Sequence, residues 1–473
     1  MGSPKGLRLF GRGCGGWKPS PFLIVSMLDP TSRDTIAAVA TAKGEGGVAV
    51  VRISGGGAAS VLSSVFRRAS ETAWNSGRMY RGTMVSGEEI IDEGLAALFR
   101  GPRSYTGEDV AEIHGHGGYT APDRVLRACL DAGARLALPG EFTFRAFING
   151  KLDLMQAEAV ADLIESSTPA DAALSAKALL GELSGRFTAI QDALLGLLAR
   201  IEACADFPEE DIEEVTASHA LSVLEPMVTE LETSIGDASH LRLLREGVRV
   251  CLTGSPNAGK SSLFNALLKE NRALISEYAG TTRDALEERL RIGDMDIVLT
   301  DTAGLRDSAH PIERMGVERA YEALNAADVA LCVIDCSKPL SAEDRAALDA
   351  TGGMRRVVAL SKADLGCLVD ITGAVRVSAV TGAGLDTLRD TLANLCAEAR
   401  GNASPAFLRQ RQVDAAAAAL TALIAAGDAL RSMPLDCAAI DLKDAYRALG
   451  AITGRGADED VVQAIFSTFC LGK

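Results

Sequence analysis

The sequence predicts a multidomain chain: an α+β amino-terminal domain, an all-α helical bundle, and an α/β domain inserted into that bundle. Short apolar runs separated by Gly-rich turns occupy the first part of the chain, to about residue 150. Ala/Leu-rich stretches with helical spacing lie on both sides of a region where apolar runs of strand length end in short polar motifs. The 473 residues suffice for about three domains, each with its own core.

Composition limits the classes of function. A formal net charge of −15 argues against a protein that binds nucleic acid over a broad basic face. We therefore expect any RNA to be contacted locally or through a partner protein. Ten cysteines without a CxxC pair indicate buried thiols in a reducing cytosol. No apolar run approaches the roughly 18 residues of a membrane span. We therefore expect a cytoplasmic protein without a membrane anchor.

Residues 1–33 are predicted to form a disordered extension. Four basic residues precede any acidic one, namely Lys5, Arg8, Arg12 and Lys18. The apolar run Phe22–Val25 is too short and too late for a secretory signal. Met27 lies just ahead of the first structured pattern and could itself be the start. Organellar import through a transit peptide is the less favoured alternative.

The amino-terminal domain is expected over 34–150. Two strands, 34–40 and 48–53, flank a Gly-rich turn, and a helix is expected over 139–150. With a period of two, Arg52 lies on an otherwise apolar strand face, where a guanidinium requires an anionic partner. At this stage a structural ion pair and a ligand are equally good explanations.

A second polar stretch of this domain, Ser104–Gly118, reads as a turn, a short strand and a Gly-rich exit. Glu112 and His114 share one face of that strand. The pair His114 and His116 could be half of a metal site, but no third ligand stands out, and we do not favour that interpretation.

Helical spacing then dominates 151–247, with an acidic run at 205–214 that a solvated connection explains better than a docking surface. Two further helical segments are expected at 410–432 and 442–469. Because helices precede and follow the self-contained α/β unit of 248–398, that unit is predicted to be inserted into one bundle and to sit on a hinge.

The α/β unit begins with the stretch Gly254–Ser262, GSPNAGKSS, which follows an apolar strand and precedes a helix. Its glycines allow successive backbone N–H groups to turn toward a phosphate. Lys260 supplies a charge for the β- and γ-phosphates, and the Ser261 hydroxyl is placed to bind Mg²⁺. This motif in this context predicts nucleoside-triphosphate binding.

Three further motifs complete the nucleotide site, and two of them identify the base. Asp301–Gly304, DTAG, ends a strand as expected for a Mg²⁺ and γ-phosphate loop. Asp364 of the motif Ser361–Asp364 can accept hydrogen bonds from guanine N1–H and its amino group, a pair that adenine does not offer. A backbone N–H at Ser378–Ala379 can meet guanine O6. The ordered set predicts GTP; the alternative is a row of ordinary strand-to-loop turns.

Nearly the whole chain from Asp34 to Lys473 resembles one family, the tRNA-modification GTPases MnmE, also called TrmE. The segments that carry the resemblance, besides the nucleotide motifs, are Gly46–Gly55, Tyr105–Gly118, Pro139–Asp153, Ala279–Asp284 and Ile465–Lys473. The last of these is the most specific, and its final four residues fit a prenylation box poorly.

The resemblance implies a tetrahydrofolate-binding-like amino-terminal domain, a helical domain and a Ras-like P-loop GTPase domain. It also implies a homodimer that, with the FAD-containing partner MnmG, adds a carboxymethylaminomethyl-type group at C5 of the wobble uridine of certain tRNAs. The carbon comes from 5,10-methylene- or 5-formyl-tetrahydrofolate, and most of the RNA contact falls to the partner. The implied boundaries are 34–150 for the folate-type domain, 151–247 and 399–473 for the helical domain, and 248–398 for the GTPase domain.

Residue by residue, the resemblance implies folate contacts at Arg52, Glu112, Lys151 and Lys473. It implies Mg²⁺ ligands at Ser261 and Thr282, and potassium ligands at Asn257, Ser276, Tyr278 and Thr281. Glu313 takes the catalytic role beside Lys260, because Leu305 follows the DTAG glycine where other GTPases carry Gln. The implied GTP-binding set is Asn257, Ala258, Gly259, Lys260, Ser261, Ser262, Ser276, Thr281, Thr282, Asp301, Thr302, Ala303, Gly304, Ser361, Lys362, Asp364, Ser378 and Ala379.

Ser361 departs from the family pattern, which has Asn at this position. A hydroxyl reaches less far than a carboxamide, so we expect one contact to the base or the P-loop to be long, water-filled or absent. The rival function is a ribosome-assembly or signalling switch without chemistry beyond GTP hydrolysis. The block around Glu112 and the ending Phe469–Lys473 argue against it, since such a switch has no use for them.

Overall fold

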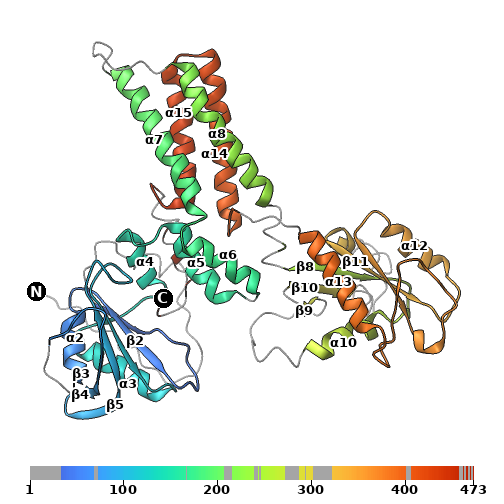
Figure 1. The fold of residues 1–473 in the computed structure, drawn as a ribbon, viewed down its shortest axis with the longest axis horizontal. Coiled ribbons are helices and arrows are strands. Elements are labelled where there is room, and N and C mark those ends of the chain that lie inside the picture. Colours follow the sequence, from blue (N-terminus) through green and yellow to red (C-terminus); the bar gives the residue numbers. More distant parts are fainter. Residues whose placement is uncertain are drawn as a thin grey trace, which may run out of the picture. The chain divides into compact units, whose positions relative to one another are not determined.

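The computed structural model describes residues 34–68, 73–166, 168–206, 216–238, 247–271, 287–292, 295–301, 322–400 and 406–456, with the single positions 243, 462, 465, 466, 469 and 472. By its internal contacts the chain forms two compact units. One unit combines 1–158 with 454–473, and the other comprises 159–453. Figure 1 shows the elements of both.

The first unit contains a seven-stranded sheet of order β3-β4-β5-β6-β2-β1-β7, antiparallel except for the pair of β1 and β7. Its strands are β1 (Ile36–Val39), β2 (Ala49–Ser54), β3 (Phe66–Arg68), β4 (Met79–Ser86), β5 (Glu89–Phe99), β6 (Val110–Gly115) and β7 (Arg135–Leu136). Its helices are α2 (Ala58–Val65), α3 (Thr120–Asp131) and α4 (Glu141–Ile148). The strands predicted around the Gly-rich turn are confirmed as β1 and β2.

Alternation along β2 and β6 divides their side chains between two faces of the sheet. Val51 and Ile53 pack with Ile113 into a core that α2 and α3 cover. The intervening residues of these strands, Arg52 and Glu112, therefore project together from the other face, and they are direct partners in the strand register.

Helices of the second unit come from both sides of the α/β segment. They are α5 (Leu154–Glu165), which begins in the first unit, α6 (Pro169–Leu179), α7 (Ser184–Asp206), α8 (Ala217–Asp237), α14 (Gln410–Ser432) and α15 (Leu435–Thr453). The helices α7, α8, α14 and α15 pack against one another (Figure 1). Buried Gln191 of α7 joins the halves, because its amide bonds the Tyr446 carbonyl at 3.1 Å and the Thr453 hydroxyl at 2.6 Å. The predicted single bundle is confirmed.

The predicted helical segment 442–469 starts too late and is interrupted after residue 453, whereas the described positions Val462, Ile465 and Phe466 beyond the interruption are helical again. The observed helix, α15, begins seven residues earlier, at Leu435, and stops at Thr453. Gly454 follows with a φ of 88°, a left-handed conformation that ends a helix and suits glycine. A Cβ on Gly454 would lie 2.5 Å from the Phe147 ring, so the turn also requires a residue without a side chain.

The α/β segment forms a six-stranded sheet of order β13-β12-β11-β8-β10-β9, parallel except for β9. Its elements are β8 (Val248–Thr253), α10 (Lys260–Asn271), β9 (Glu287–Ile292), β10 (Met295–Asp301), β11 (Val329–Asp335), α12 (Ala342–Ala350), β12 (Arg356–Ser361), β13 (Val375–Arg376) and α13 (Leu385–Arg400). All seven residues of β11 are buried, as in a strand covered on both faces.

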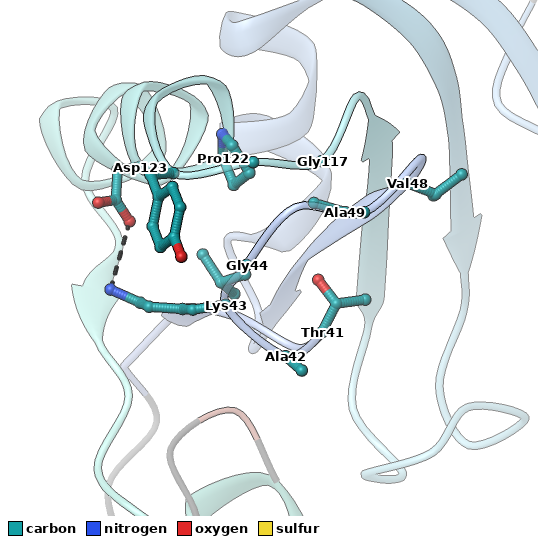
Figure 2. Close-up of a pocket in the computed structure, with 13 residues that line it drawn as sticks. Thr41, Ala42, Lys43, Gly44, Val48, Ala49, Gly117, Pro122 and Asp123 are labelled. Atoms are coloured by element: carbon teal, nitrogen blue, oxygen red, sulfur yellow. Dashed lines mark ion pairs between the residues drawn. The ribbon is translucent and has the colours of Figure 1, made fainter. Parts of the chain in front are cut away.

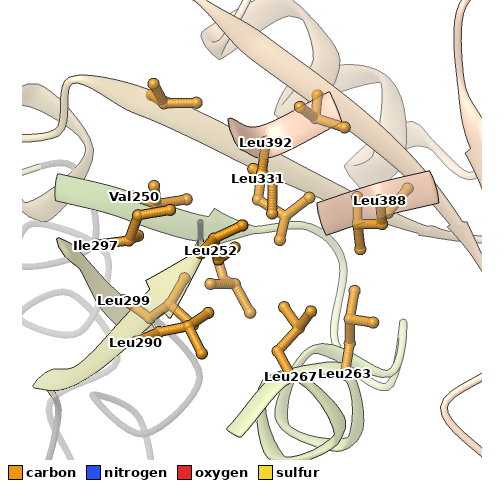
Figure 3. Packing of buried hydrophobic residues seen from close by; sticks show 14 of the residues in the cluster. Val250, Leu252, Leu263, Leu267, Leu290, Ile297, Leu299, Leu331, Leu388 and Leu392 are labelled. Atoms are coloured by element: carbon orange, nitrogen blue, oxygen red, sulfur yellow. The ribbon is translucent and has the colours of Figure 1, made fainter. Parts of the chain in front are cut away.

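Alternate residues of the central strands face different helices. Figure 3 shows Leu252 and Leu331 packing with Leu263 of α10 and Leu388 of α13 in one cluster. Ile334 belongs to a second cluster with residues of α12. The doubly wound arrangement places the carboxyl ends of β8, β10, β11 and β12 at one edge, where such sheets bind ligands.

Among the described residues, α14 is long and apolar enough to cross a membrane by length and composition alone, an exception to the prediction that no segment is. A buried core helix passes the same test. One face of α14, including Ala416, Leu423 and Leu430, is buried.

Candidate functional site

The loop between β8 and α10 has the form that the sequence predicts. Gly254 begins it with a φ of 147°, and a Cβ there would lie 2.1 Å from the Val333 carbonyl oxygen of neighbouring β11. Asn257 also adopts a left-handed conformation, with a φ of 62°. The loop therefore packs so closely on β11 that only glycine fits its first position.

Lys260 begins α10 and turns its ammonium back into the loop. The Nζ atom donates to the carbonyl oxygens of Gly254 at 3.0 Å and Ser255 at 2.8 Å, and the residue is 7% exposed. Ser261 and Ser262 follow in the exposed first turn of the helix. A nearly buried cation thus adjoins the N-terminus of α10, an arrangement that favours an anionic group.

The base-recognition segment begins at the end of β12. The Ser361 hydroxyl donates to the Ala258 carbonyl of the loop, and it lies 3.1 Å from the Ile334 carbonyl. The expectation of a long or missing contact is wrong on the P-loop side. The P-loop and the end of β12 lie close enough for the Ser361 hydroxyl to reach the Ala258 carbonyl. One hydroxyl proton nevertheless serves two carbonyl acceptors, whereas a carboxamide carries two N–H donors.

Lys362 continues this link between the two loops. It adopts a left-handed conformation with a φ of 57°, and its Nζ donates to the Asn257 carbonyl at 2.8 Å. The same Nζ lies 2.7 Å from Asp335 Oδ2. Asp364 is exposed in the short 3₁₀ turn Ala363–Leu365, so its carboxylate is open to a ligand.

Asp335, the last residue of β11, was missed by the sequence analysis. Burial tends to raise the pKa of its carboxyl, but hydrogen bonds from Lys362 and Ser337 outweigh that effect and hold the pKa below its usual value. Its position could have indicated a role. Asp335 is an acidic residue at the end of an apolar strand, and that strand lies between β8 and β12, which both lead into nucleotide motifs.

The last predicted base contact, Ser378–Ala379, lies just beyond the end of β13. The strand β13 is only two residues long, and the Ser378 N–H donates to the Ala383 carbonyl at 2.9 Å. The Ser378 hydroxyl accepts from the Thr381 N–H at 3.2 Å. These bonds engage both the N–H and the hydroxyl of Ser378 within the loop, and Ala379 next to it is half-buried.

In the first unit, the structure brings together three predicted residues. Arg52 Nε donates to Glu112 Oε1 at 3.0 Å, and His114 Nε2 lies 3.3 Å from Glu112 Oε2. The Arg52 guanidinium also lies 5.1 Å from the Tyr105 ring centre and 5.8 Å from that of Phe142. The hydrogen bond to His114, together with Arg52 and against the effect of burial, lowers the pKa of Glu112.

The ion-pair explanation of Arg52 is thus realised, although both side chains remain about one-fifth exposed, 19% for Arg52 and 20% for Glu112. Lys151 lies apart from this pair, with its Nζ donating to the Pro102 carbonyl at 3.0 Å. Gly107 adjoins Lys151: a Cβ there would lie 3.4 Å from the Lys151 Cγ.

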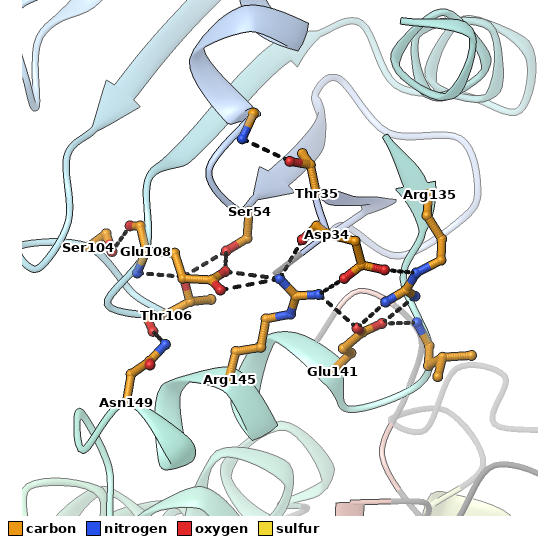
Figure 4. Close-up of polar contacts among 12 residues, drawn as sticks. Asp34, Thr35, Ser54, Ser104, Thr106, Glu108, Arg135, Glu141, Arg145 and Asn149 are labelled. Carbon is orange, nitrogen blue, oxygen red and sulfur yellow. Dashed lines mark hydrogen bonds and ion pairs between the residues drawn. The ribbon is translucent and has the colours of Figure 1, made fainter. Parts of the chain in front are cut away.

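A buried charge cluster beside α4 was not predicted. Figure 4 shows Arg145 surrounded by three carboxylates, with Asp34 at 2.7 Å, Glu108 at 3.1 Å and Glu141 at 3.1 Å. Arg135 bonds two of the same acids. Arg145 is 7% exposed and Glu141 5%, so the cluster is a structural link between β1, α4 and the loop before β6.

A small pocket lies between the two Gly-rich turns of the first unit (Figure 2). Lys43 and Asp123 approach to 3.7 Å at its rim, and both are well exposed. The Gly118 N–H donates to the Gly44 carbonyl, which joins the turns. Arg52, Glu112 and Lys151 do not line it.

Several predicted residues lie outside the described part of the chain: Ser276, Tyr278, Thr281, Thr282, Thr302, Ala303, Gly304, Glu313 and Lys473. Asp301 is placed as the end of β10, beside Leu252 of β8. Within the described residues no group of three His, Cys, Asp or Glu side chains is arranged to hold a metal, and His114 with His116 gains no third ligand.

A doubly wound, mostly parallel sheet whose first β–α turn is GSPNAGKSS, with SKAD at the end of β12, defines a P-loop GTPase domain. Two sequence families match the chain, "GTP-binding protein TrmE N-terminus" over 35–151 and "MnmE helical domain" over 154–470. The chain belongs to the MnmE (TrmE) family of tRNA modification GTPases, and it is a GTP-hydrolysing enzyme.

Individual relatives match along nearly their whole length. The tRNA modification GTPase MnmE of Geotalea uraniireducens is 40% identical, covering 93% of this chain and 99% of its own. That of Roseiflexus sp. is 42% identical with the same coverage. Among solved structures, the G domain of the T. maritima FeoB iron transporter is similar over 32% of this chain and 99% of its own, at 24% identity and a TM-score of 0.25.

Proposed function

We propose that this GTPase modifies C5 of the wobble uridine of certain tRNAs, adding a carboxymethylaminomethyl-type group with a one-carbon unit from tetrahydrofolate. It acts in the cytoplasm as a homodimer with an FAD-containing partner of the MnmG type. The formal charge of −15 supports this division of labour, because an acidic chain leaves most of the RNA contact to a partner.

The nucleotide half of the proposal assigns the triphosphate to the loop 254–259 and the start of α10. Lys260 is already held there as a nearly buried cation. Hydroxyl and carboxylate oxygens suit Mg²⁺. Ser261 is exposed in the first turn of α10, and Asp301 ends β10, the parallel neighbour of the strand that leads into the loop, so Ser261 and Thr282 would bind the ion. Mg²⁺ would neutralise charge that develops on the phosphates.

Guanine is assigned to the segment Ser361–Asp364 and to Ala379. Asp364 is exposed at the same edge of the sheet as the P-loop. Ser361 and Lys362 bond the P-loop carbonyls of Ala258 and Asn257, and so connect the P-loop to the base-recognition segment. For hydrolysis we assign the water-orienting role to Glu313 and the potassium site to Asn257, Ser276, Tyr278 and Thr281. Potassium would occupy roughly the space of an arginine finger.

The folate half rests on one observation, the Arg52 and Glu112 pair. These charges project from the sheet face opposite the core, remain partly exposed, and are bordered by the Tyr105 and Phe142 rings. Aromatic edges suit a flat pterin, a carboxylate can pair with its ring N–H groups, and cations suit the glutamate tail. Lys151 and Lys473 would add to that positive charge.

Calorimetry with 5-formyltetrahydrofolate tests this assignment. The intact protein should release heat of binding, and Arg52→Ala should lose it. Arg81→Ala is the matched control, because Arg81 pairs with Glu93 across neighbouring strands of the same sheet but is well exposed. An intact protein that binds no folate would refute the folate half, while unmodified wobble uridines in cells lacking the protein would support the proposed reaction.

A further inference from the structure

Asp335 is held at the junction of the two nucleotide loops by donors on different segments. Its Oδ1 accepts from the Ser337 N–H at 3.0 Å and the Ser337 hydroxyl at 2.6 Å. Its Oδ2 lies 2.7 Å from Lys362 Nζ, and the residue is 8% exposed. The Ser337 bonds fix the orientation of the carboxylate independently of the lysine, so Asp335 is a rigid anchor.

The backbone brings this anchor to the base-recognition segment. In the parallel pair of β11 and β12, Asp335 is the register partner of Ser361. The ladder extends one residue further, because the Cys336 N–H donates to the Ser361 carbonyl at 3.1 Å. Since Lys362 follows directly, its side chain starts beside Asp335 and reaches the Asn257 carbonyl of the P-loop, 2.8 Å from Nζ.

A lysine ammonium on four rotatable bonds does not hold one position by itself. Its second bond here is to a neutral carbonyl, whereas the phosphates of a nucleotide would attract it as a competing anion. A fixed carboxylate at 2.7 Å opposes that attraction and restricts the rotamers of Lys362. The distance between the two loops is then set before a nucleotide spans them.

We propose that Asp335 is a positioning residue for guanine-nucleotide binding, which anchors Lys362 against the Asn257 carbonyl and so fixes the spacing of the P-loop and the base-recognition segment. The inference rests on the proposed assignment of Ser361–Asp364 to the base. It adds a residue outside the nucleotide motifs that acts only through Lys362.

A double-mutant cycle in the full-length protein tests this role. Asp335→Asn keeps the side-chain shape and removes the charge, and it should weaken GDP binding by about tenfold or more, the scale of one hydrogen bond to a charged group. In the Lys362→Met background the same change should weaken GDP binding less than about twofold. At saturating GTP, kcat should stay within about twofold, because the anchor lies away from the hydrolysed bond.

Asp328→Asn is the matched control. Asp328 precedes the opposite end of β11, where its carboxylate accepts from the Arg249 N–H at 2.9 Å, so it shares the strand but not the loops. Its substitution should leave the Kd for GDP unchanged. If Asp335→Asn does not fold, Ser337→Ala replaces it, with an expected loss of about twofold or more that also disappears without Lys362.

Two outcomes would overturn the inference: an unchanged Kd, or an equal loss with and without Lys362. The second would make Asp335 a merely structural residue. Failure of the underlying base assignment looks different, because the wild-type protein would then bind ADP as well as GDP. If the wild-type protein prefers GDP over ADP but Asp335→Asn leaves the Kd for GDP unchanged, only the role of Asp335 is refuted.

Discussion

Arg145 and Glu141 lie one turn apart on α4 with 3.1 Å between Nη2 and Oε1, and both are almost fully buried. Arg145 also bonds Asp34 and Glu108, so one guanidinium neutralises carboxylates from three segments of the first unit. Removing one partner of a buried ion pair leaves uncompensated charge, whereas an exposed pair contributes little. Arg135 also pairs with Asp34 and Glu141, but Arg145 is the more buried of the two cations and bonds all three acids, so the stability of this unit depends strongly on it.

Arg145→Ala is expected to reduce the free energy of unfolding of the first unit by about 3–5 kcal/mol. Urea denaturation followed by the fluorescence of Trp74, a residue packed on the core of that unit, measures the change. Arg127→Ala is the control, because Arg127 pairs with Asp131 while both are more than half exposed, and it should cost at most about 1 kcal/mol. Equal effects of the two substitutions would contradict the argument.

The pH dependence of stability should report on Glu112. Its folded pKa lies below the ordinary 4.5, because of the hydrogen bond with His114 and the charge of Arg52, against the effect of burial. Such a group contributes stability that is complete above its unfolded pKa and is lost as pH falls through the folded pKa. The Tm of the wild-type protein should exceed that of Glu112→Gln at pH 7.

This advantage should shrink as pH falls below about 4.5, since protonated Glu112 then resembles Gln. Thermal melts from pH 7 to pH 3.5 measure the gap, with Glu88→Gln as control because the Glu88 side chain is 98% exposed. A gap of constant size over that range would show that the charge of Glu112 does not stabilise the fold.

The sequence was sufficient wherever an element depends on neighbouring residues. The GSPNAGKSS loop follows a strand and starts a helix as predicted, because glycine spacing and apolar runs are local signals. The insertion of the α/β segment was also predictable, since α14 begins at Gln410 with the same helical spacing as the helices before the insertion.

Contacts between distant segments were not predictable. Arg145 and Asp34 are 111 residues apart in the sequence, and nothing local marks either as buried. Asp335 became part of the candidate site only because β11 pairs with β12 in a register that sets it beside Ser361. The early start of α15 was missed although Leu435, Ala438 and Leu442 already have helical spacing and Pro434 precedes them.

Potassium dependence of GTP hydrolysis is predicted from Asn257 and the segment Ser276–Thr281, which offer oxygen ligands where no arginine finger is evident. An arginine finger is worth roughly 10³–10⁵ in kcat, so replacing potassium by the smaller sodium ion should lower turnover more than about tenfold. Phosphate release in KCl and NaCl of equal ionic strength measures this. Equal rates in the two salts would contradict the assignment, and Asn257→Ala should reduce the preference.

Gly254→Ala should impair both folding and nucleotide binding. A Cβ would lie 2.1 Å from the Val333 carbonyl at a φ of 147°, so the loop must move away from β11. Strain of this kind costs on the order of 1–3 kcal/mol, and we expect a lower Tm and at least about tenfold weaker GDP binding. Gly353→Ala is the control, because no atom lies within 4 Å of its Cβ position. Unchanged GDP affinity in Gly254→Ala would contradict the close packing of the loop.

Ser361 offers the sharpest test of the base-recognition segment. Its hydroxyl has one proton, but the carbonyl oxygens of Ala258 and Ile334 both lie within hydrogen-bonding reach. Ser361→Asn supplies two N–H donors, and one additional neutral hydrogen bond is worth about 0.5–1.5 kcal/mol. GDP should therefore bind about two- to tenfold more tightly, and the preference for GDP over ADP should persist because Asp364 is unchanged.

Ser361→Ala is the companion variant. It leaves both carbonyl oxygens without this donor in a site where residue 361 is only 5% exposed, so GDP affinity should fall by about the same factor. Titration of both variants with a fluorescent GDP analogue, competed by ADP, gives the affinities and the selectivity together. If Ser361→Asn weakens GDP binding instead, the cost of fitting a larger side chain against Gly259 exceeds one hydrogen bond, and the site is matched to serine.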